Sequence, residues 1–237
     1  MSGLLWERVR GNRMIARLLL QNLMWTVGLG ALLFLPAGTL HWPAAWLYLT
    51  TTAVLGLALG LWFARVDPAL LEERMRPMMQ EGQPAADKKF MFSFGFAALV
   101  WFIIIGLDRR WHGSDVPVAL QVLGYGLLLA SMALITWVAR ANSFAAPVVK
   151  VQAERGHRVI DTGPYALVRH PMYSGAVLYF AAIALLLGSW WGFVLSPVFF
   201  VLFAFRATIE ERALIDGLPG YADYLARVRY RLVPGVW

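Results

Sequence analysis

Residues 163–175 read Gly-Pro-Tyr-Ala-Leu-Val-Arg-His-Pro-Met-Tyr-Ser-Gly and continue directly into an apolar run that ends near residue 187. A second apolar run follows, and beyond it lie Arg206 and the adjacent carboxylates Glu210 and Glu211. Ionisable side chains at the mouth of a membrane segment are costly to keep there and mark candidate functional sites. The sequence therefore predicts a membrane-embedded hairpin with its chemistry at the polar end.

The whole chain has the composition of a membrane protein. Of its 237 residues, 59% are hydrophobic and 15% are charged, whereas a typical soluble domain has about 25% charged residues. The first four apolar runs approach the ~20 residues that span a bilayer, and the last two are shorter. The runs cover residues 18–35, 43–64, 90–107, 117–139, 172–187 and 191–205. We expect an all-α polytopic bundle of five to six spanning segments, the last two forming a short helical hairpin.

The chain divides into two parts. Residues 1–139 form an expected transmembrane bundle of four spans, the first a retained span rather than a cleaved signal peptide, because its apolar part is long and no good cleavage site follows. Residues 140–237 hold a polar loop, the hairpin and the C-terminal region with the candidate chemistry. Within 65–89, Asp67-Pro68 predicts a helix start. We expect that helix to lie on the membrane surface through Leu70, Leu71 and Met75, before a turn at 81–84.

The basic residues predict the orientation. Nineteen of the 21 Lys and Arg residues lie in residues 1–17, 65–89, 140–170 and from 206 onward, and only Arg109 and Arg110 lie in the other connections. The positive-inside rule then places both termini in the cytoplasm. We expect a multi-pass protein of a bacterial inner membrane. The net charge of +7 is accounted for by this orientation, so we expect no nucleic-acid partner.

Two kinds of site are disfavoured. The chain has no Cys, which excludes disulfides, thiolate metal ligands and a thiol nucleophile. The four His residues are scattered without the spacing of a metal motif, so we expect no metal. The pattern leaves the oligomeric state open.

The polar loop at 140–170 is patterned by turns. Residues 148–152 and 158–160 are β-like, and turns are expected at 154–157 and 161–164. A loop of this kind suits a polar ligand held against the bundle, although the same pattern also fits an ordinary connection.

His170-Pro171 predicts the start of the hairpin's first helix. Proline is favoured at the first helical position, and the N-terminal end of a helix attracts anions. Tyr165, His170 and Tyr173 gather at this entrance, where they can stack on a heterocycle or hydrogen-bond to it. The alternative is an interfacial aromatic belt with a helix-starting proline.

Arg206 and Glu210 lie four residues apart and so share one helix face, with Glu211 about 100° away. One reading is an exposed ion pair that contributes only ~0.3–0.5 kcal/mol. The hairpin would instead bring this face beside His170 and Tyr173. Such a site suits a zwitterionic or cationic cofactor and a polar or anionic lipid-borne substrate.

These residues make the chain recognisable. Residues 140–237 resemble the isoprenylcysteine carboxyl methyltransferase family of integral membrane enzymes and its phospholipid N-methyltransferase relatives. The resemblance rests on the Arg-His-Pro-x-Tyr-x-Gly element at 169–175 together with the downstream Glu pair. It also includes Gly163, Tyr165, Leu214, Tyr221, Tyr224, Val228, Arg231, Pro234 and Gly235.

The resemblance implies an S-adenosylmethionine-dependent methyltransferase with a lipophilic or lipid acceptor, a carboxylate first of all. It implies Arg206, Glu210 and Glu211 as catalytic residues, Arg206 being the one that binds the substrate. The cofactor contacts that it implies are Gln152, His157, Arg158, Val159, Ile160, Tyr165, Arg169, His170, Pro171, Met172, Tyr173 and Glu210. The gap between Gln152 and His157 is about two residues shorter than in eukaryotic members. An amine or thiol acceptor would need a base, for which Glu211 is nearest.

Two other functions remain open. Membrane sterol and steroid reductases share a related C-terminal element but bind NADPH. They usually have Asn before the Tyr and lack the acidic pair, whereas this chain has Met172 and Glu210-Glu211. A non-enzymatic scaffold or transporter is compatible with six spans, although no inverted repeat supports it.

Overall fold

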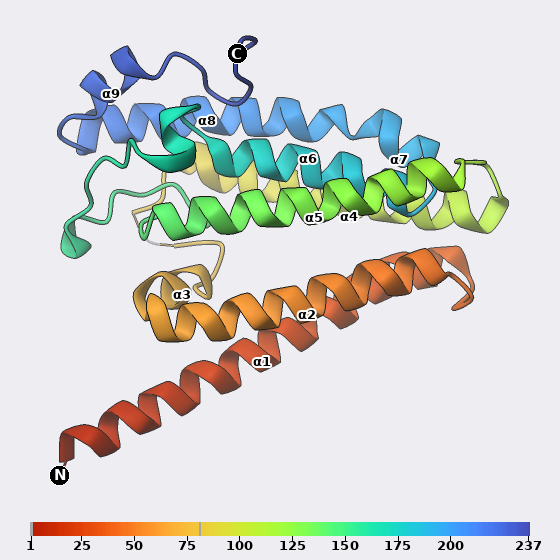
Figure 1. The fold of residues 1–237 in the computed structure, drawn as a ribbon, viewed down its shortest axis with the longest axis horizontal. Coiled ribbons are helices and arrows are strands. Elements are labelled where there is room, and N and C mark those ends of the chain that lie inside the picture. The colour runs from red at the N-terminus through yellow and green to blue at the C-terminus, as the bar shows by residue number, and fades with distance from the viewer. Residues whose placement is uncertain (1, 81) are drawn as a thin grey trace.

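The computed structural model describes residues 2–80 and 82–237, with side chains from residue 11 onward (Figure 1). Within these ranges the chain forms helices and no strand. The helices are α1 (Ser2–Ala37), α2 (Pro43–Val66), α3 (Pro68–Arg74), α4 (Ala85–Trp111), α5 (Val118–Ala141), α6 (Pro171–Leu186), α7 (Trp190–Leu195), α8 (Pro197–Gly217) and α9 (Tyr221–Arg227), with short 3₁₀ turns at Ala153–Arg155 and Gly163–Ala166. The predicted all-α fold is confirmed.

Five helical segments are long and apolar enough to cross a membrane. They are Gly11–Ala37, Pro43–Val66, Ala85–Trp111, Val118–Ala141 and Trp190–Gly217, and α6 is a shorter apolar helix. The last segment joins α7 and α8 and has 28 residues, so the prediction that both hairpin arms are short was wrong. Pro197 occupies the first turn of α8 and lets the chain bend without ending the apolar segment. The helix then continues past the apolar run to Gly217.

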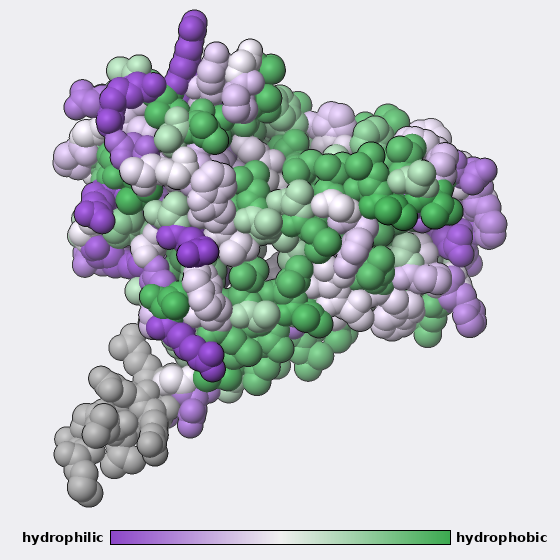
Figure 2. Space-filling model, in the orientation of Figure 1, coloured by the Kyte–Doolittle hydropathy of each residue, from purple (hydrophilic) through white to green (hydrophobic). Residues whose placement is uncertain are grey.

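The surface agrees with a membrane location. Figure 2 shows polar side chains at the two ends of the molecule and an apolar band between them. Large apolar side chains within the candidate spans, such as Leu20, Met24, Trp25 and Val201, are exposed. Helices satisfy their own backbone hydrogen bonds, which allows such a band to face lipid. The chain is thus a multi-pass integral membrane protein.

The ends of the bundle differ in charge. Helix α1 begins at one end of the long axis, where α3, α9 and the loop after α5 also lie, and the C-terminal tail runs back from that end along α8 (Figure 1). These segments hold the basic clusters predicted from the sequence, although the side chains of Arg8 and Arg10 lie outside the described part. Arg109 and Arg110 stand in the last turn of α4 at the opposite end.

Helices α5 and α6 approach each other most closely. A Cβ on Gly124 of α5 would lie 2.5 Å from the backbone nitrogen of Leu186, and one on Gly175 of α6 would lie 2.8 Å from Ile135. Ser131 donates a hydrogen bond to the carbonyl oxygen of Gly175 at 2.8 Å. Small residues allow such backbone contact in membrane bundles. The two helices are therefore closely packed and support the polar end, where α6 begins.

Helix α3 begins as predicted but lies elsewhere. The Asp67 side chain caps it by accepting the Leu70 N–H at 3.0 Å, with Pro68 in the first turn. Leu70, Leu71 and Met75, expected to face the membrane surface, are buried against Leu18 and neighbouring residues of the bundle. That expectation was wrong, because an amphipathic pattern does not say whether lipid or protein covers the apolar face.

The predicted turn after α3 can be followed only in part. Glu81 lies outside the described residues. Gly82 has a φ of +74°, which glycine adopts readily.

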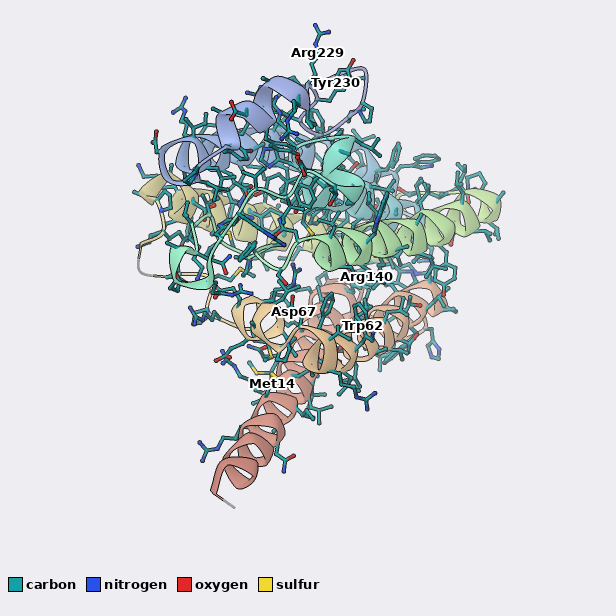
Figure 3. All side chains as sticks on the ribbon, turned by 60° about the vertical axis from the view of Figure 1, so that its left-hand side comes forward. Met14, Trp62, Asp67, Arg140, Arg229 and Tyr230 are labelled. Carbon is teal, nitrogen blue, oxygen red and sulfur yellow. The ribbon has the colours of Figure 1, made fainter. Side chains whose placement is uncertain are left out.

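The α1–α2 pair forms a layer of its own below the other helices (Figure 1). Arg140 of α5 lies 5.3 Å above the ring of Trp62 of α2 and joins the two layers at the polar end (Figure 3). This cation–π contact joins residues near the ends of the two apolar segments Pro43–Val66 and Val118–Ala141.

Candidate functional site

A cavity of about 90 Å³, partly open to solvent, lies at the polar end where α6 begins and α8 ends. The loop after α5, the start of α6, the end of α8 and α9 form its wall. The predicted cofactor residues that line it are His157, Arg158, Val159, Ile160, Tyr165, Arg169, His170, Met172, Tyr173 and Glu210. Gln152, Pro171, Arg206 and Glu211 are not part of the lining.

The start of α6 is fixed by the C-terminal tail. Pro171 begins the helix with His170 as its N-cap, as predicted. The backbone N–H groups of Arg169 and His170 donate to the carbonyl oxygens of Tyr230 and Arg231, both at 2.9 Å. Figure 3 shows Tyr230 on the tail, on the far side of the bundle from α1 and α2. The tail therefore sets the direction in which the helix entrance faces.

Glu210 meets that entrance. Its Oε2 accepts a hydrogen bond from the Tyr173 hydroxyl at 2.5 Å and lies 3.4 Å from His170 Nδ1. The rings of His170 and Tyr173 are nearly parallel, with centroids 5.3 Å apart. The predicted proximity of Glu210 to His170 and Tyr173 is confirmed. The Glu210 carboxylate thus faces the cavity at the start of α6, with Tyr173 and His170 as its partners.

Glu211 points away from the cavity and is enclosed by cationic side chains. Its Oε1 lies 3.1 Å from Arg169 Nη1 and 3.3 Å from His170 Nε2. Its Oε2 accepts from Arg231 Nε and Nη2, both at 2.9 Å. The side chain is buried, which makes these contacts strong. Glu211 joins α8 to the helix entrance and the tail, and it does not line the cavity where a general base would act.

His170 stands between the two glutamates. Burial opposes its charged form, but hydrogen bonds to Glu210 and Glu211 outweigh burial and raise the pKa of His170 above its ordinary 6.5. Nδ1 faces one carboxylate and Nε2 the other. Only the protonated imidazole can donate from both nitrogens at once. The ring thus links the cavity to the Glu211 cluster.

Aromatic residues complete the wall, including some that the sequence did not identify as site residues. The Tyr165 hydroxyl accepts from Asn142 Nδ2 at 2.9 Å, and Tyr224 donates to the carbonyl oxygen of Tyr165 at 2.8 Å. Asn142, Phe144, Tyr221 and Tyr224 all line the cavity. Tyr221 and Tyr224 belonged to the pattern that carried the resemblance, and their spacing on one helix face could have placed them here.

Side-chain contacts, and not strand pairing, hold the loop at 140–170. The predicted extended pieces at 148–152 and 158–160 do not pair, and a 3₁₀ turn with Gly156 at φ +66° separates them. His157 stacks on Phe144 with centroids 4.5 Å apart, and its Nδ1 accepts the Gln152 N–H at 3.3 Å. Burial lowers the pKa of His157, which suits an accepting nitrogen. The turn at 154–157 was predicted correctly.

Gln152 supports this loop from behind. Its side chain is fully buried, donates to the carbonyl oxygen of Phe144 at 2.8 Å and accepts from Arg155. It therefore reaches the cavity only through Phe144 and His157.

Arg206 has a partner that the sequence did not indicate. Its Nε donates to Asp87 Oδ1 of α4 at 3.0 Å, and its Nη2 donates to the carbonyl oxygen of Pro147 at 2.5 Å. The guanidinium lies between the rings of Phe90 and Tyr173, 4.8 and 5.5 Å from their centroids. No ion pair with Glu210 is found among the described residues. Arg206 thus lies behind Tyr173, one ring away from the cavity.

Comparison with known proteins agrees with this site. Residues 119–217 match the phospholipid methyltransferase family. Over 129 residues the chain is 28% identical to protein-S-isoprenylcysteine O-methyltransferase B of Arabidopsis thaliana, an alignment covering 52% of this chain and 60% of that relative. The predicted resemblance to isoprenylcysteine carboxyl methyltransferases is confirmed.

The match to the phospholipid methyltransferase family spans α5 to the end of α8. The similarity to these methyltransferases therefore includes the loop, the helix entrance and Glu210. Helix α9 and the tail, which supply Tyr221, Tyr224 and Arg231, lie beyond the residues matched to that family.

Proposed function

We propose that this protein is an integral membrane methyltransferase that transfers the methyl group of S-adenosylmethionine to a lipophilic, membrane-borne acceptor. The observation that carries the proposal is the Glu210 carboxylate, held by Tyr173 and His170 in a cavity at the start of α6. This arrangement lies in the part of the chain that matches methyltransferase relatives.

The residues at the cavity fit the proposed cofactor. Glu210 would hold the cationic end of the cofactor, and the aromatic wall around Tyr165 would hold its adenine. Arg169 lines the cavity, and its buried Nε has no hydrogen-bond partner among the described residues. It would hold the cofactor's carboxylate.

Bound S-adenosylmethionine would supply a methyl group activated by its sulfonium charge. The protein's own part is then to bind both reactants, orient them and exclude water. Holding two reactants in line can supply ~7–11 kcal/mol of the barrier. The fixed contacts of Glu210 with Tyr173 and His170 serve this orientation.

A carboxylate is the favoured acceptor. It needs no deprotonation before it attacks, whereas an amine or thiol needs a base. Glu211, the nearest candidate base, is occupied by Arg169, His170 and Arg231. We assign Arg206 the role of orienting the acceptor's carboxylate, because a guanidinium can grip one in bidentate fashion. The chain spans 60% of its plant relative, whose name describes O-methylation of isoprenylcysteine.

Calorimetric titration of the purified protein in lipid nanodiscs tests this function. S-adenosylmethionine should bind, and NADPH should not. Glu210→Gln removes a charge-assisted contact, so affinity should fall roughly 10- to 150-fold. Asp216→Asn is the matched control, since it removes an exposed carboxylate from the same helix. Unchanged affinity in folded Glu210→Gln protein, or tight binding of NADPH, would refute the proposal.

We further propose that the cavity faces the cytoplasm, with both termini on that side. The support is the gathering of basic residues at the end of the bundle where the cavity lies. Single cysteines introduced into this Cys-free chain report the orientation. A cysteine at Asp216 should react with a membrane-impermeant maleimide only after cells are opened. Labelling in intact cells would show that the cavity faces the outside and would contradict the proposed orientation.

A further inference from the structure

We infer that Asp87 is a positioning residue for the proposed methyl transfer, because it holds Arg206 and the adjacent cavity wall in one geometry. The inference rests on the proposed function for its chemistry and on the geometry of α4, α8 and the loop for its contacts. Asp87 lies 119 residues before Arg206, and its side chain is fully buried.

Each oxygen of Asp87 has a separate task. Oδ1 accepts from Arg206 Nε at 3.0 Å. Oδ2 accepts from Gln83 Nε2 at 2.7 Å and from the backbone N–H of Val149 at 2.9 Å. The carboxylate therefore ties α8 to the start of α4 and to the loop after α5.

The ion pair grips the cavity wall from two sides. Asp87 holds the N–H of Val149, and Arg206 holds the carbonyl oxygen of Pro147. Ala146 and Val148, which flank Pro147, line the cavity. A shift of the ion pair would thus move the wall as well as the guanidinium. Proper placement matters, since a misplacement of 1 Å can cost about 10²-fold in rate.

A structural role alone does not explain this burial. An acid in the first turn of a helix is favourable on the surface, where the helix dipole stabilises it. Asp87 stands in the first turn of α4 but is fully buried with a buried arginine. Replacing a buried ion pair by apolar residues is often neutral or stabilising. A buried charge pair beside the proposed site therefore points to the orientation of Arg206.

Two aromatic rings hold the faces of the Arg206 guanidinium. Phe90 and Tyr173 flank the guanidinium, and Tyr173 lines the cavity and binds Glu210. Asp87 and Pro147 take Nε and Nη2, and no hydrogen bond or ion pair to Nη1 is found in residues 11–80 and 82–237. Asp87 thus fixes one edge of the guanidinium and leaves the opposite edge for an acceptor.

Chemical modification of Arg206 tests the contact without any acceptor. The protein in nanodiscs is treated with p-hydroxyphenylglyoxal, and modification is quantified by mass spectrometry relative to Arg231, which Glu211 holds. Asp87→Asn should raise Arg206 modification about ten-fold or more, as expected when a buried guanidinium loses its anionic partner. Asp87→Glu should restore protection in part. Gln83→Met removes the contact to Oδ2 and the acceptor of the Gln80 N–H but leaves Oδ1 to Arg206, so it should leave modification within about two-fold.

Kinetics test whether the contact serves catalysis. With N-acetyl-S-farnesylcysteine as the probe acceptor and saturating S-adenosylmethionine, Asp87→Asn should lower turnover about 10- to 100-fold. Its cofactor Kd should rise by a smaller factor than turnover falls, because Asp87 supports the wall beside Ala146 and Val148 but does not itself line the cavity. Adding Arg206→Lys should cause little further loss, since both changes affect one interaction.

The outcomes separate this inference from the proposed function. Wild-type protein that binds no S-adenosylmethionine refutes the function, and Arg206 modification still decides whether Asp87 holds Arg206. If wild-type protein binds the cofactor but does not methylate the probe, Arg206 modification again decides whether Asp87 holds Arg206. Unchanged Arg206 modification in folded Asp87→Asn protein overturns the inference. So does an equal effect of Gln83→Met, which would show that the contact at Oδ1 has no particular part in holding Arg206.

Discussion

The two ends of the bundle bury carboxylates among different neighbours. At the cavity end, Glu211 is held by guanidinium and imidazole groups. At the opposite end, Asp108 Oδ2 of α4 accepts from the hydroxyls of Ser114 and Ser189 at 2.6 and 2.5 Å. Ser189 in turn caps α7 by accepting the Gly192 N–H at 3.0 Å.

The difference teaches that burial of an acid does not by itself mark a functional site. Neutral hydroxyls that also cap a helix make Asp108 part of a tight turn between helices. At the cavity end Glu211 is paired with cations, and two of them, Arg169 and His170, also line the cavity. Charge that is both buried and shared with a cavity is the feature that we associate with function.

The largest expected effect is on stability, at Glu211. Glu211→Gln leaves Arg169 and Arg231 without their anion and His170 with Glu210 alone, and breaking a buried pair costs roughly 3–5 kcal/mol. Chemical denaturation in detergent should show this loss. The neighbouring Glu210→Gln should lose less stability and more cofactor affinity. If the two variants have the same pattern, the distinction between the Glu211 cluster and the cavity is wrong.

The second effect is a dependence on pH. Because the pKa of His170 is raised above 6.5 in the folded protein, its charged form contributes stability that is complete below pH 6.5. This stability is lost as the pH rises through the folded pKa. The apparent melting temperature should therefore fall on the alkaline side, and His170→Gln should flatten that fall.

His157 is the control for this measurement. Its pKa is lowered, so its contribution has the opposite sign and is lost as the pH falls below 6.5. His157→Gln should leave the alkaline fall in place. An unaltered alkaline fall in His170→Gln would assign it to another group.

The smallest effect is expected at Asp108. Asp108→Asn keeps the shape and one acceptor oxygen, so it should cost about 1 kcal/mol, the net value of an ordinary hydrogen bond. Cofactor affinity should be unchanged, because Asp108 stands at the end away from the cavity. Titration and denaturation of the same preparation measure both. A large loss of affinity would show that the two ends are coupled and would end the comparison.

The spans of the fold and the side of the site formed by α6 and Glu210 could be predicted from local sequence pattern. Apolar length gave the spans, and His170-Pro171 gave the start of α6, because a proline fixes its own position in a helix. The hairpin brought Glu210 to His170 and Tyr173 as expected. These features depend on neighbours in sequence or on one short connection.

The rest depended on packing between distant segments. Asp87 and Arg206 are 119 residues apart, and Glu211 and Arg231 are joined by a tail whose path has no pattern. One signal for Asp87 was available, namely a single acid at the start of an apolar span. The surface location predicted for α3 failed for the same reason, since Leu70 and Leu71 are covered by protein.

The close approach of α5 and α6 determines which parts of the protein can admit a ligand. Gly124 and Gly175 bring the two backbones together, so neither helix can slide without collision. The loop at 140–170 and the tail are joined to this frame mainly by side chains and a few backbone bonds. A ligand would therefore enter by movement of the loop and the tail, while α5 and α6 stay in place. Hydrogen exchange should be fast in the loop and the tail and slow along α5 and α6.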